Sequence, residues 1–216
     1  MVIALDGPAA SGKGTLARLI SQTYAFAYLD TGTLYRGVAW TLLEAGFDPA
    51  DEASAAAAAE SYDHSGALDA DLRTPQISAA SSVVAKQPAV RAALLAFQRR
   101  FAETPPSGAP GAVLDGRDIG TVVYPDAQVK FFVTANARER ARRRWLELSP
   151  SRPGLDQETV YRDLLERDAR DAGRADAPLA RAEDAELLDT THLSIDAAFA
   201  AARRVIDGAL RRCRQL

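Results

Sequence analysis

The sequence predicts an α/β fold with a parallel sheet, and two observations near its N-terminus lead to this prediction. Val2–Leu5 is a short apolar run with β-branched residues that stops at Asp6-Gly7-Pro8, as a buried strand stops at a glycine turn. A helical pattern, a second apolar run and a second helical pattern follow before Gly46. Such alternation of strand and helix is typical of a parallel sheet covered by helices.

Each element of the N-terminal half has its own pattern. Apolar residues recur at helical spacing from Lys13 to Tyr24, and again after the strand Phe26–Leu29, up to Gly46 as a C-cap. Three further helices are predicted, the last with proline in its first turn: Ala53–Glu60, Thr74–Lys86 and Pro88–Glu103. Ser61–Leu72 has no clear periodicity and is either a set of short strands or an irregular insertion.

The C-terminal half continues the alternation. Thr104–Gly111 is rich in proline and glycine and is predicted as a surface loop. The elements predicted after it are the strands Ala112–Asp115 and Gln128–Val133, the basic helix Asn136–Leu148, a break at Ser149–Gly154, the charged helix Asp156–Ala172, the strand Leu187-Leu188 and the helix Ser194–Arg214. In the last helix one apolar stripe is interpreted as core: Ile195, Phe199, Ala202, Ile206 and Leu210.

Length and composition bound the class of protein. The 216 residues fit one domain, 47% of them are hydrophobic, and the net charge of −3 argues against a protein that coats nucleic acid. A single cysteine excludes a disulfide framework, and two distant histidines disfavour a zinc site. No apolar stretch is long enough for a membrane span or a signal peptide. We therefore expect a soluble, cytoplasmic protein with no nucleic-acid or membrane partner.

The segment between the first strand and the first helix has the composition of a phosphate-binding loop. Its residues are Gly7, Pro8, Ala9, Ala10, Ser11, Gly12, Lys13, Gly14 and Thr15. Glycines let successive backbone N–H groups converge on phosphate oxygens, the helix N-terminus adds partial positive charge, and Lys13 supplies a mobile cation. Serine or threonine usually follows the lysine directly. Here Gly14 intervenes, and Thr15 becomes the candidate ligand of a Mg²⁺ ion accompanying ATP.

Such a loop alone does not distinguish a kinase from a GTPase or an ATP-driven motor. Proteins that read guanine usually carry an Asn/Thr-Lys-x-Asp motif. None of the three lysines, Lys13, Lys86 and Lys130, has that context, and this disfavours a GTPase.

Arginines outside the loop indicate a second anion site. Arg36 follows the second strand, and Arg117 lies in the turn after another strand, near the sheet edge where ligands bind. Four residues of the charged helix share one face: Arg167, Arg170, Asp171 and Arg174. Proline and glycine flank this helix. It is either a lid that closes over polyphosphate or an exposed face paired with its own acidic residues.

The basic helix also has two interpretations. Arg140, Arg143 and Arg144 form one face, which is either a solvated surface or a set of guanidinium planes that stack on an adenine ring.

Together these segments resemble bacterial cytidylate kinase, in order and in spacing. The segments that carry the resemblance are Gly7–Thr15, Asp30–Arg36, Arg73 through Ser82 to Arg91, Asp115–Thr121 and Glu166–Arg174. The resemblance implies one P-loop kinase domain over residues 1–216, with a nucleoside-monophosphate-binding insertion at 37–88 and a short helical lid at 149–178. It also implies a monomer that transfers the γ-phosphoryl group of ATP to CMP or dCMP with Mg²⁺.

The resemblance implies roles for individual residues as well. The family positions that grip the CMP phosphate match Arg36, Arg117 and Arg174, those at the sugar match Arg167 and Asp171, and those at the base match Ser82, Arg91 and Asp118. Thr31, where the family often has serine, and Tyr35 complete the implied CMP site. The implied catalytic residues are Lys13, Arg117, Arg170 and Arg174, and Arg140 and Arg144 are expected beside ATP.

Hydrogen-bond chemistry agrees with the assignment at the base. Cytosine presents a donor at N4 and an acceptor at N3, and uracil reverses the two. An acceptor such as Asp118 or Ser82 beside the donor Arg91 therefore favours cytosine. Two alternatives stay open: a related kinase for UMP, AMP, dTMP or shikimate, and a nucleotide switch or ATP-binding module without an acceptor. The arginines outside the loop argue against the second, because it needs no second anion site.

Overall fold

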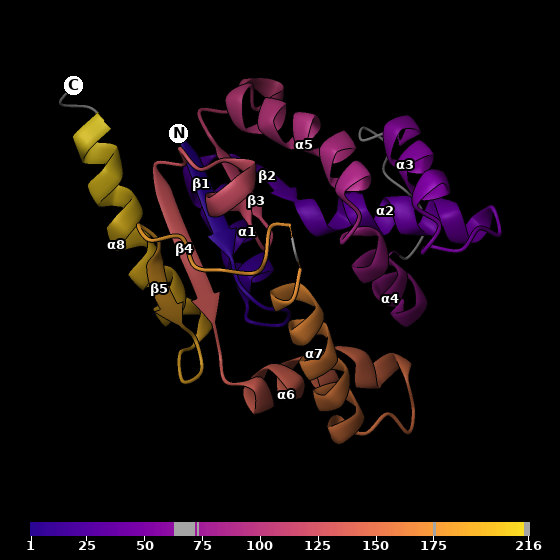
Figure 1. Cartoon of the computed structure of the whole chain (residues 1–216). Helices are drawn as coiled ribbons and strands as arrows, with labels where there is room; N and C mark the ends of the chain where they lie inside the picture. Colours follow the sequence, from indigo (N-terminus) through magenta and orange to yellow (C-terminus); the bar gives the residue numbers. More distant parts are fainter. Residues whose placement is uncertain (63–71, 73, 175, 214–216) are drawn as a thin grey trace.

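Five strands form one parallel sheet at the centre of the molecule (Figure 1). Their order across the sheet is β2-β3-β1-β4-β5, and they comprise Val2–Asp6 (β1), Ala27–Asp30 (β2), Ala112–Asp115 (β3), Val129–Thr134 (β4) and Glu186–Asp189 (β5). The computed structural model describes residues 1–62, 72, 74–174 and 176–213. The predicted α/β class with a parallel sheet is confirmed.

The central strand β1 is covered on both faces, as its uninterrupted apolar sequence requires. Its residues 3–5 are fully buried. On one face the covering side chains come from α1 (Lys13–Tyr24) and α8 (Ile195–Cys213), and on the other from α5 (Pro88–Glu103) and a π-helical turn at Ile119–Val123. Because the strands are parallel, their carboxyl ends share one edge of the sheet, and the ligand-binding segments are expected there.

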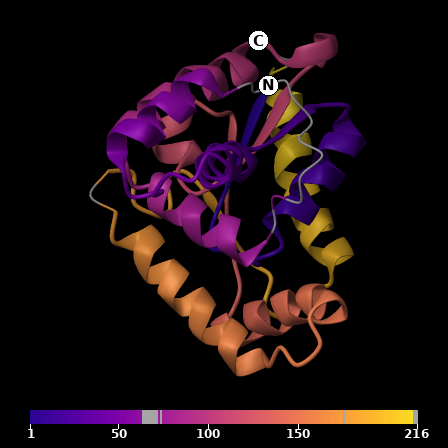
Figure 2. The same ribbon diagram turned by 90° about the vertical axis from the view of Figure 1, so that its right-hand side faces the viewer.

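A second group of helices lies beside the sheet and has a hydrophobic core of its own (Figures 1 and 2). It consists of α2 (Thr31–Glu44), α3 (Glu52–Ser61), α4 (Pro75–Val84) and the first half of α5. Its buried side chains include Val38, Leu42, Val84, Val90 and Leu94. Most of the segment 61–72, predicted as short strands or an irregular insertion, lies outside the described residues, as does Arg73.

The helices α6 (Ala137–Leu148) and α7 (Gln157–Ala172) lie beyond the carboxyl edge of the sheet (Figures 1 and 2). Their contact buries Ala141, Val160 and Leu164, and it also includes alanines of the loop after β1. A short 3₁₀ turn at Ser149–Ser151 joins the helices where the sequence predicts a break. This pair of helices therefore packs directly on the phosphate-binding loop.

The structure corrects the predicted elements at a few points. The loop 104–111 contains a 3₁₀ turn at Pro106–Gly108, and the π-helical turn after β3 was not predicted. The apolar stripe of α8 is shifted: the buried residues are Ala198, Ala202, Ile206 and Ala209, whereas Phe199 and Leu210 are only partly buried and Ile195 is 39% exposed. Small alanines let the helix approach the sheet closely, and Ile195 in its first turn lies beyond that contact.

Among the described helices, none combines the length and apolar character needed to cross a membrane.

Candidate active site

The loop between β1 and α1 has the backbone conformation of an anion cradle. Gly7 has a φ of +142°, and a Cβ at this position would lie 2.0 Å from the carbonyl oxygen of Val133, so the loop passes directly against β4. Gly12 has a φ of +92° and caps α1 with no side-chain hydrogen bond. The first N–H groups of α1 therefore have no capping side chain and are suited to bind phosphate.

Lys13 is the first residue of α1 and reaches back over this loop. Its Nζ donates to the carbonyl oxygen of Pro8 at 3.1 Å and lies 3.8 Å from the carboxylate of Asp115. Burial and the nearby Arg117 lower the pKa of Lys13 to about 8. An anion in the loop would offset both effects, because it favours the charged ammonium group.

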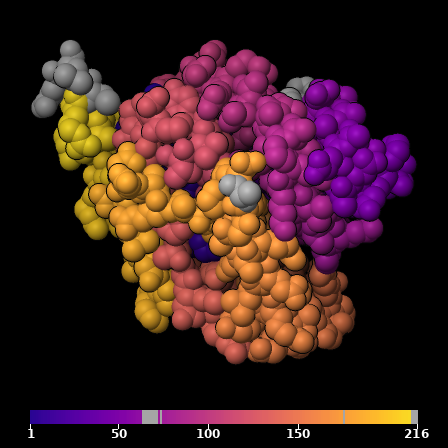
Figure 3. Space-filling view, in the orientation of Figure 1, coloured from indigo at the N-terminus to yellow at the C-terminus, as the bar shows by residue number. Residues whose placement is uncertain are grey.

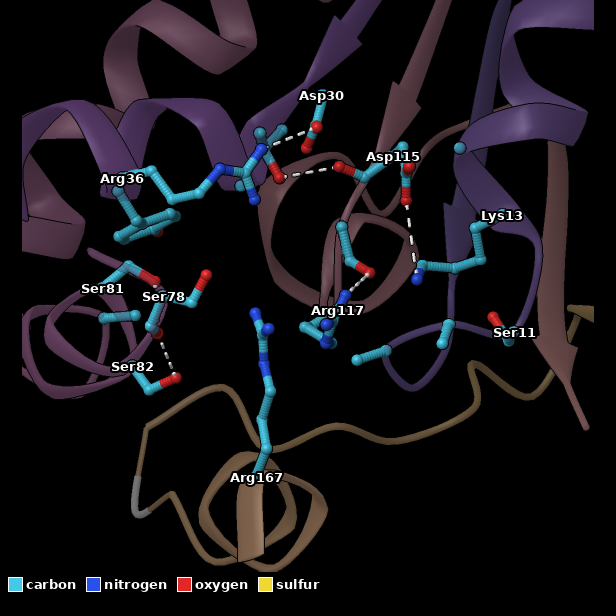
Figure 4. A pocket seen from close by; sticks show the side chains of 18 of the residues that line it. Ser11, Lys13, Asp30, Arg36, Ser78, Ser81, Ser82, Asp115, Arg117 and Arg167 are labelled. Carbon is cyan, nitrogen blue, oxygen red and sulfur yellow. Dashed lines mark hydrogen bonds and ion pairs between the residues drawn. The ribbon is translucent and has the colours of Figure 1, made fainter. Parts of the chain in front are cut away.

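A cavity of about 520 Å³ opens where the loop, α2, α4, the turn after β3 and α7 meet. Figure 3 shows indigo atoms of the N-terminal segment at the bottom of a hollow bordered by the orange segment, and Figure 4 shows the side chains around the cavity. The predicted site residues that line it are Ala9, Ala10, Ser11, Gly12, Lys13, Gly14, Thr15, Thr31, Tyr35, Arg36, Ser82, Arg91, Arg117, Asp118, Arg144, Arg167 and Arg174. The fold thus brings together most of the residues predicted to bind ATP and most of those predicted to bind CMP.

Arginines dominate the middle of the cavity. Arg167 reaches from α7 toward Arg36 and Arg117 (Figure 4). Burial and the charge of Arg117 lower the pKa of Arg167 to about 10. In the part of the chain that the structure describes, the Nε atoms of Arg36, Arg167 and Arg174 have no hydrogen-bond acceptor. Mutually repelling cations with unused donors are a suitable environment for phosphate.

Two carboxylates orient these arginines. Asp30 at the end of β2 accepts from Arg36 at 2.8 Å. Asp171 is buried behind the cavity and accepts from Arg117 at 2.9 Å and from Arg174 at 2.5 Å. Asp171 does not line the cavity itself, and it acts there through its two partners.

The far end of the cavity presents hydrogen-bonding groups suited to a base. Arg91 forms an ion pair with Asp118 and donates to the hydroxyl of Tyr35 at 3.4 Å. Burial raises the pKa of Asp118, although Arg91 opposes this rise. Ser82 lies beside them and donates to the carbonyl oxygen of Ser78 at 3.2 Å. This end therefore combines a carboxylate, a guanidinium and hydroxyl groups.

Sequence reasoning missed several polar residues near the cavity. Ser78 and Ser81 line it from α4. Ser78 lies four residues before Ser82 and Ser81 lies three residues after Ser78, so helical spacing would have led from Ser82 to Ser78 and then to Ser81. Asp6, the last residue of β1, is buried and accepts from the backbone N–H groups of Ile119 at 2.7 Å and Gly120 at 2.8 Å. Burial raises the pKa of Asp6 to about 7. Asp6 thereby fixes the turn that carries the Arg117 and Asp118 side chains.

Two predicted arginines lie away from the cavity. Arg140 is buried, which contradicts the solvated-surface interpretation for this residue, and it donates to the carbonyl oxygen of Ala9 at 3.2 Å and to Asp168 at 2.7 Å. Arg170 is partly exposed, lies 3.9 Å from Glu166 and does not line the cavity. Arg140 thus joins the phosphate-binding loop to α7.

A second cavity of about 270 Å³ lies on the other side of the phosphate-binding loop. Ser11, Gly12 and Thr15 border both cavities, and so does Arg143 of α6. The apolar wall of the second cavity comes from α1, the segment after β5 and the start of α8: Leu16, Leu193, Ile195 and Ala198. The other polar residues at its border are Glu139 and Arg142 of α6, Thr190 and Ser194. Sequence reasoning missed this cavity because its walls come from segments almost 180 residues apart.

The donor set beside Lys13 fits a hard divalent cation. Thr15 offers a hydroxyl, and the carboxylates of Asp30 and Asp115 line the same cavity. Burial raises the pKa of Asp115, and a cation there would favour its charged form. Within the described residues no group of three His, Cys, Asp or Glu side chains is placed to hold a metal ion. Mg²⁺ usually needs only one or two carboxylates together with water and phosphate, so the set suits it.

A phosphate-binding loop at the end of β1, an arginine-rich site facing it and a helical pair packed over the loop define a P-loop kinase with a second, anionic substrate. Comparison with known proteins agrees. The chain belongs to the cytidylate kinase family, whose sequence model matches residues 3–207.

Curated relatives match nearly the whole chain. The cytidylate kinase of Paramagnetospirillum magneticum is 56% identical over 205 residues, which cover 95% of this chain and 97% of the relative. That of Rhodospirillum rubrum is 53% identical over 206 residues, with the same shares of the two chains. The crystal structure of an uncharacterized protein from Eubacterium ventriosum has the same fold, with a TM-score of 0.56, 13% identity and coverage of 96% of this chain and 98% of that one.

Proposed function

We propose that this enzyme transfers the γ-phosphoryl group of ATP to CMP or dCMP and produces ADP with CDP or dCDP. The observation that carries the proposal is the row of Arg36, Arg117 and Arg167 between the phosphate-binding loop and the polar end of the cavity. These arginines can contact the donor phosphates on the side of the loop and the acceptor phosphate on the side of the polar end. A nucleotide switch binds no acceptor and does not need such a second set of cations.

On the donor side, the loop at residues 7–15 binds the phosphates of ATP through its backbone N–H groups, and Lys13 neutralises their charge. The apolar second cavity takes the adenine ring, since it opens beside the same loop. Arg143 lines both cavities and Arg144 lines the main one, so both can contact the bound donor. Arg140 acts on the donor through the loop, whose Ala9 carbonyl it holds.

On the acceptor side, the CMP phosphate binds to Arg36, Arg117 and Arg174. The sugar lies near Arg167 and Asp171, with Thr31 and Tyr35 along the wall of α2. Ser82 and Asp118 accept from the N4 amino group of cytosine, and Arg91 donates to its N3 or O2. Uracil has a carbonyl oxygen in place of that amino group and would face the carboxylate of Asp118 with an acceptor.

The chemistry requires positioning and neutralisation of charge. The attacking oxygen of CMP belongs to a phosphate that is already negatively charged near neutral pH, so no general base is needed. Lys13 and the arginines bring the two phosphates into line and stabilise the transferring group. Arg170 lies outside the cavity here. It can join these cations only if α7, which belongs to the predicted lid at 149–178, moves inward. Such closure would also exclude water from ATP.

Mg²⁺ fits this scheme as the cofactor that would neutralise the charge of the donor phosphates. Thr15 would hold it, with Asp115 and Asp30 beside it. We propose that the enzyme acts as a monomer of one P-loop kinase domain with the 37–88 insertion.

The decisive experiment measures ADP release in a coupled assay with Mg-ATP and a panel of acceptors: CMP, dCMP, UMP, AMP, dTMP and shikimate. Fast turnover with CMP and dCMP and much slower turnover with UMP is the expected result. Preference for another acceptor would discard the cytosine assignment and keep the phosphate site. Binding of ATP without turnover on any acceptor would identify a switch or binding module instead.

A further inference from the structure

We infer that Thr190 is a positioning residue of the donor half of the site, where its hydroxyl group fixes the phosphate-binding loop at Ser11 together with the guanidinium group of Arg143. The inference rests on the proposed function, since it takes ATP as the ligand of this loop. It concerns a residue outside every motif of the sequence, in the segment that follows the last strand.

Thr190 is buried directly after β5, with 5% of its surface exposed. Its backbone N–H donates to the carbonyl oxygen of Thr134 at 2.8 Å, which extends the pairing with β4 by one residue. Its Oγ1 lies 2.9 Å from the carbonyl oxygen of Ser11 and 3.1 Å from that of Thr134. The single hydroxyl proton is therefore shared between the strand and the phosphate-binding loop.

The same hydroxyl group accepts a hydrogen bond from Arg143. Nη1 of Arg143 donates to Oγ1 of Thr190 at 2.9 Å, Nη2 donates to the Thr190 carbonyl oxygen at 2.6 Å, and Nε donates to Glu139 at 2.9 Å. Three of the five N–H bonds of the guanidinium group thus set its plane and leave two for a ligand. Nη1 also lies 3.9 Å from the position of a Cβ on Gly12.

These contacts join three segments around the second cavity, two of which, the phosphate-binding loop and α6, also border the main cavity. Ser11 and Gly12 belong to the loop, Arg143 belongs to α6, and Thr190 is 179 positions away from Ser11 in the sequence. A threonine that only completed the sheet would need no acceptor beyond Thr134. Thr190 instead sets the distance between the loop and the guanidinium group of Arg143. In the proposed complex this group lies where the phosphates and the base of ATP meet.

The test replaces Thr190 by valine, which keeps the shape of the side chain and removes the hydroxyl group. We expect the KM for ATP to rise about tenfold, equal to about 1.4 kcal/mol, and the KM for CMP to stay within about twofold of the wild-type value. Thr190→Ser restores the hydroxyl group and should restore the KM for ATP. A loss of the ATP effect in the Arg143→Ala background would show that Thr190 acts through Arg143.

The neighbouring Thr191 provides a matched control. Its hydroxyl group also makes two hydrogen bonds, one from the N–H of Asn136 at 2.8 Å and one to Asp189 at 2.5 Å, but it borders neither cavity. Thr191→Val should therefore leave the KM for ATP unchanged. An equal rise of that KM in both valine variants would overturn the inference, because it would reflect general loosening of this segment.

Calorimetric titration with ATP alone separates the inference from the proposed function. Tenfold weaker ATP binding by Thr190→Val supports the inference whatever the acceptor is, and unchanged binding overturns it. A lower melting temperature with unchanged ATP binding would also overturn it, because it would reveal a structural role only. Wild-type protein that binds ATP but does not phosphorylate CMP contradicts the proposed function alone, and wild-type protein that does not bind ATP contradicts both.

Discussion

The carboxylate of Asp171 accepts a hydrogen bond of 2.9 Å from Nε of Arg117, and this contact joins α7 to the turn after β3. Burial favours the neutral acid, but Arg117 and Arg174 outweigh it, and the pKa of Asp171 lies below its ordinary value. Asp171 is therefore charged and holds both arginines beside the cavity. Two of the groups proposed to bind the acceptor phosphate are thus oriented by one buried anion.

Replacement of Arg117 or Arg174 by alanine should lower kcat by about 10²-fold or more, the usual effect of removing one donor that stabilises transition-state charge. Steady-state kinetics with CMP and Mg-ATP measure this effect. Arg204→Ala, an exposed arginine of α8, is the control and should retain wild-type turnover. Near-normal turnover in both site variants would contradict the roles proposed for these arginines.

Replacement of Asp118 by asparagine should reduce discrimination between CMP and UMP. An amide offers a donor as well as an acceptor, so the site no longer favours the N4 amino group, and the ratio of kcat/KM values for CMP and UMP should fall about tenfold or more. The exposed Asp126→Asn exchange makes the same chemical change away from the cavity and should preserve the ratio. An unchanged ratio in Asp118→Asn would remove this residue from base recognition.

The arginines of α6 should differ in what their loss affects. Arg140 is a buried ion-pair partner of Asp168, so Arg140→Ala should lower the free energy of unfolding by about 3 kcal/mol or more. Arg144 lines the main cavity and is paired with Glu147, so Arg144→Ala should raise the KM for ATP with little loss of stability. Urea denaturation and steady-state kinetics of the two variants separate these effects. A raised KM for ATP without loss of stability in Arg140→Ala would instead indicate that Arg140 contacts ATP directly.

Asp6 should make the folded state less stable as the pH rises from 5 to 7.5. The pKa of Asp6 is about 7 in the folded chain, against an ordinary value of 3.8 for an aspartate side chain in water, so the folded state binds more protons in this range. Its contribution to stability is complete below pH 4 and is lost as the pH rises through 7. The loss between pH 5 and 7.5 amounts to about 2 to 3 kcal/mol.

Urea denaturation of wild-type protein and of Asp6→Asn at several pH values tests this expectation. The variant cannot titrate at this position, so its stability should change less over the range than that of the wild type. Asp163→Asn, an exchange at an exposed carboxylate of α7, should follow the wild type. Parallel curves for Asp6→Asn and the wild type would assign the pH dependence to other groups.

The sequence predicts the sheet and its helices well because their apolar patterns are local. The helix at Lys13–Tyr24 and the helix at Pro88–Glu103 have the predicted bounds, and β1 differs by one residue. The interpretation of Ile195 as core was wrong because helical spacing identifies an apolar face but does not say where the neighbouring sheet ends. The π-helical turn at Ile119–Val123 depends on the hydrogen bonds to Asp6, whose partners are more than a hundred positions away.

The sequence predicts a site residue only where that residue belongs to a local motif with a known chemical role. The loop glycines and the turn around Arg117 stand out in the sequence, and the fold brings them together. Arg140 and Arg144 look alike on a helical wheel, and only packing decides that one is buried beneath the loop while the other lines the cavity. Thr190 has no local signal, because its role comes from contacts between distant segments.

The separate hydrophobic core of α2, α3, α4 and the first half of α5 has a consequence for how the enzyme can change over time. Tyr35, Ser82 and Arg91 project from these helices, whereas Lys13 and Arg117 are anchored to the central sheet. Substitutions that reshape the helical layer can therefore alter which base is accepted while the strands that support phosphoryl transfer keep their packing. Two of the three groups proposed to contact the base, Ser82 and Arg91, therefore belong to a different layer from Lys13, while Asp118 and its ion pair with Arg91 link base recognition to the central sheet.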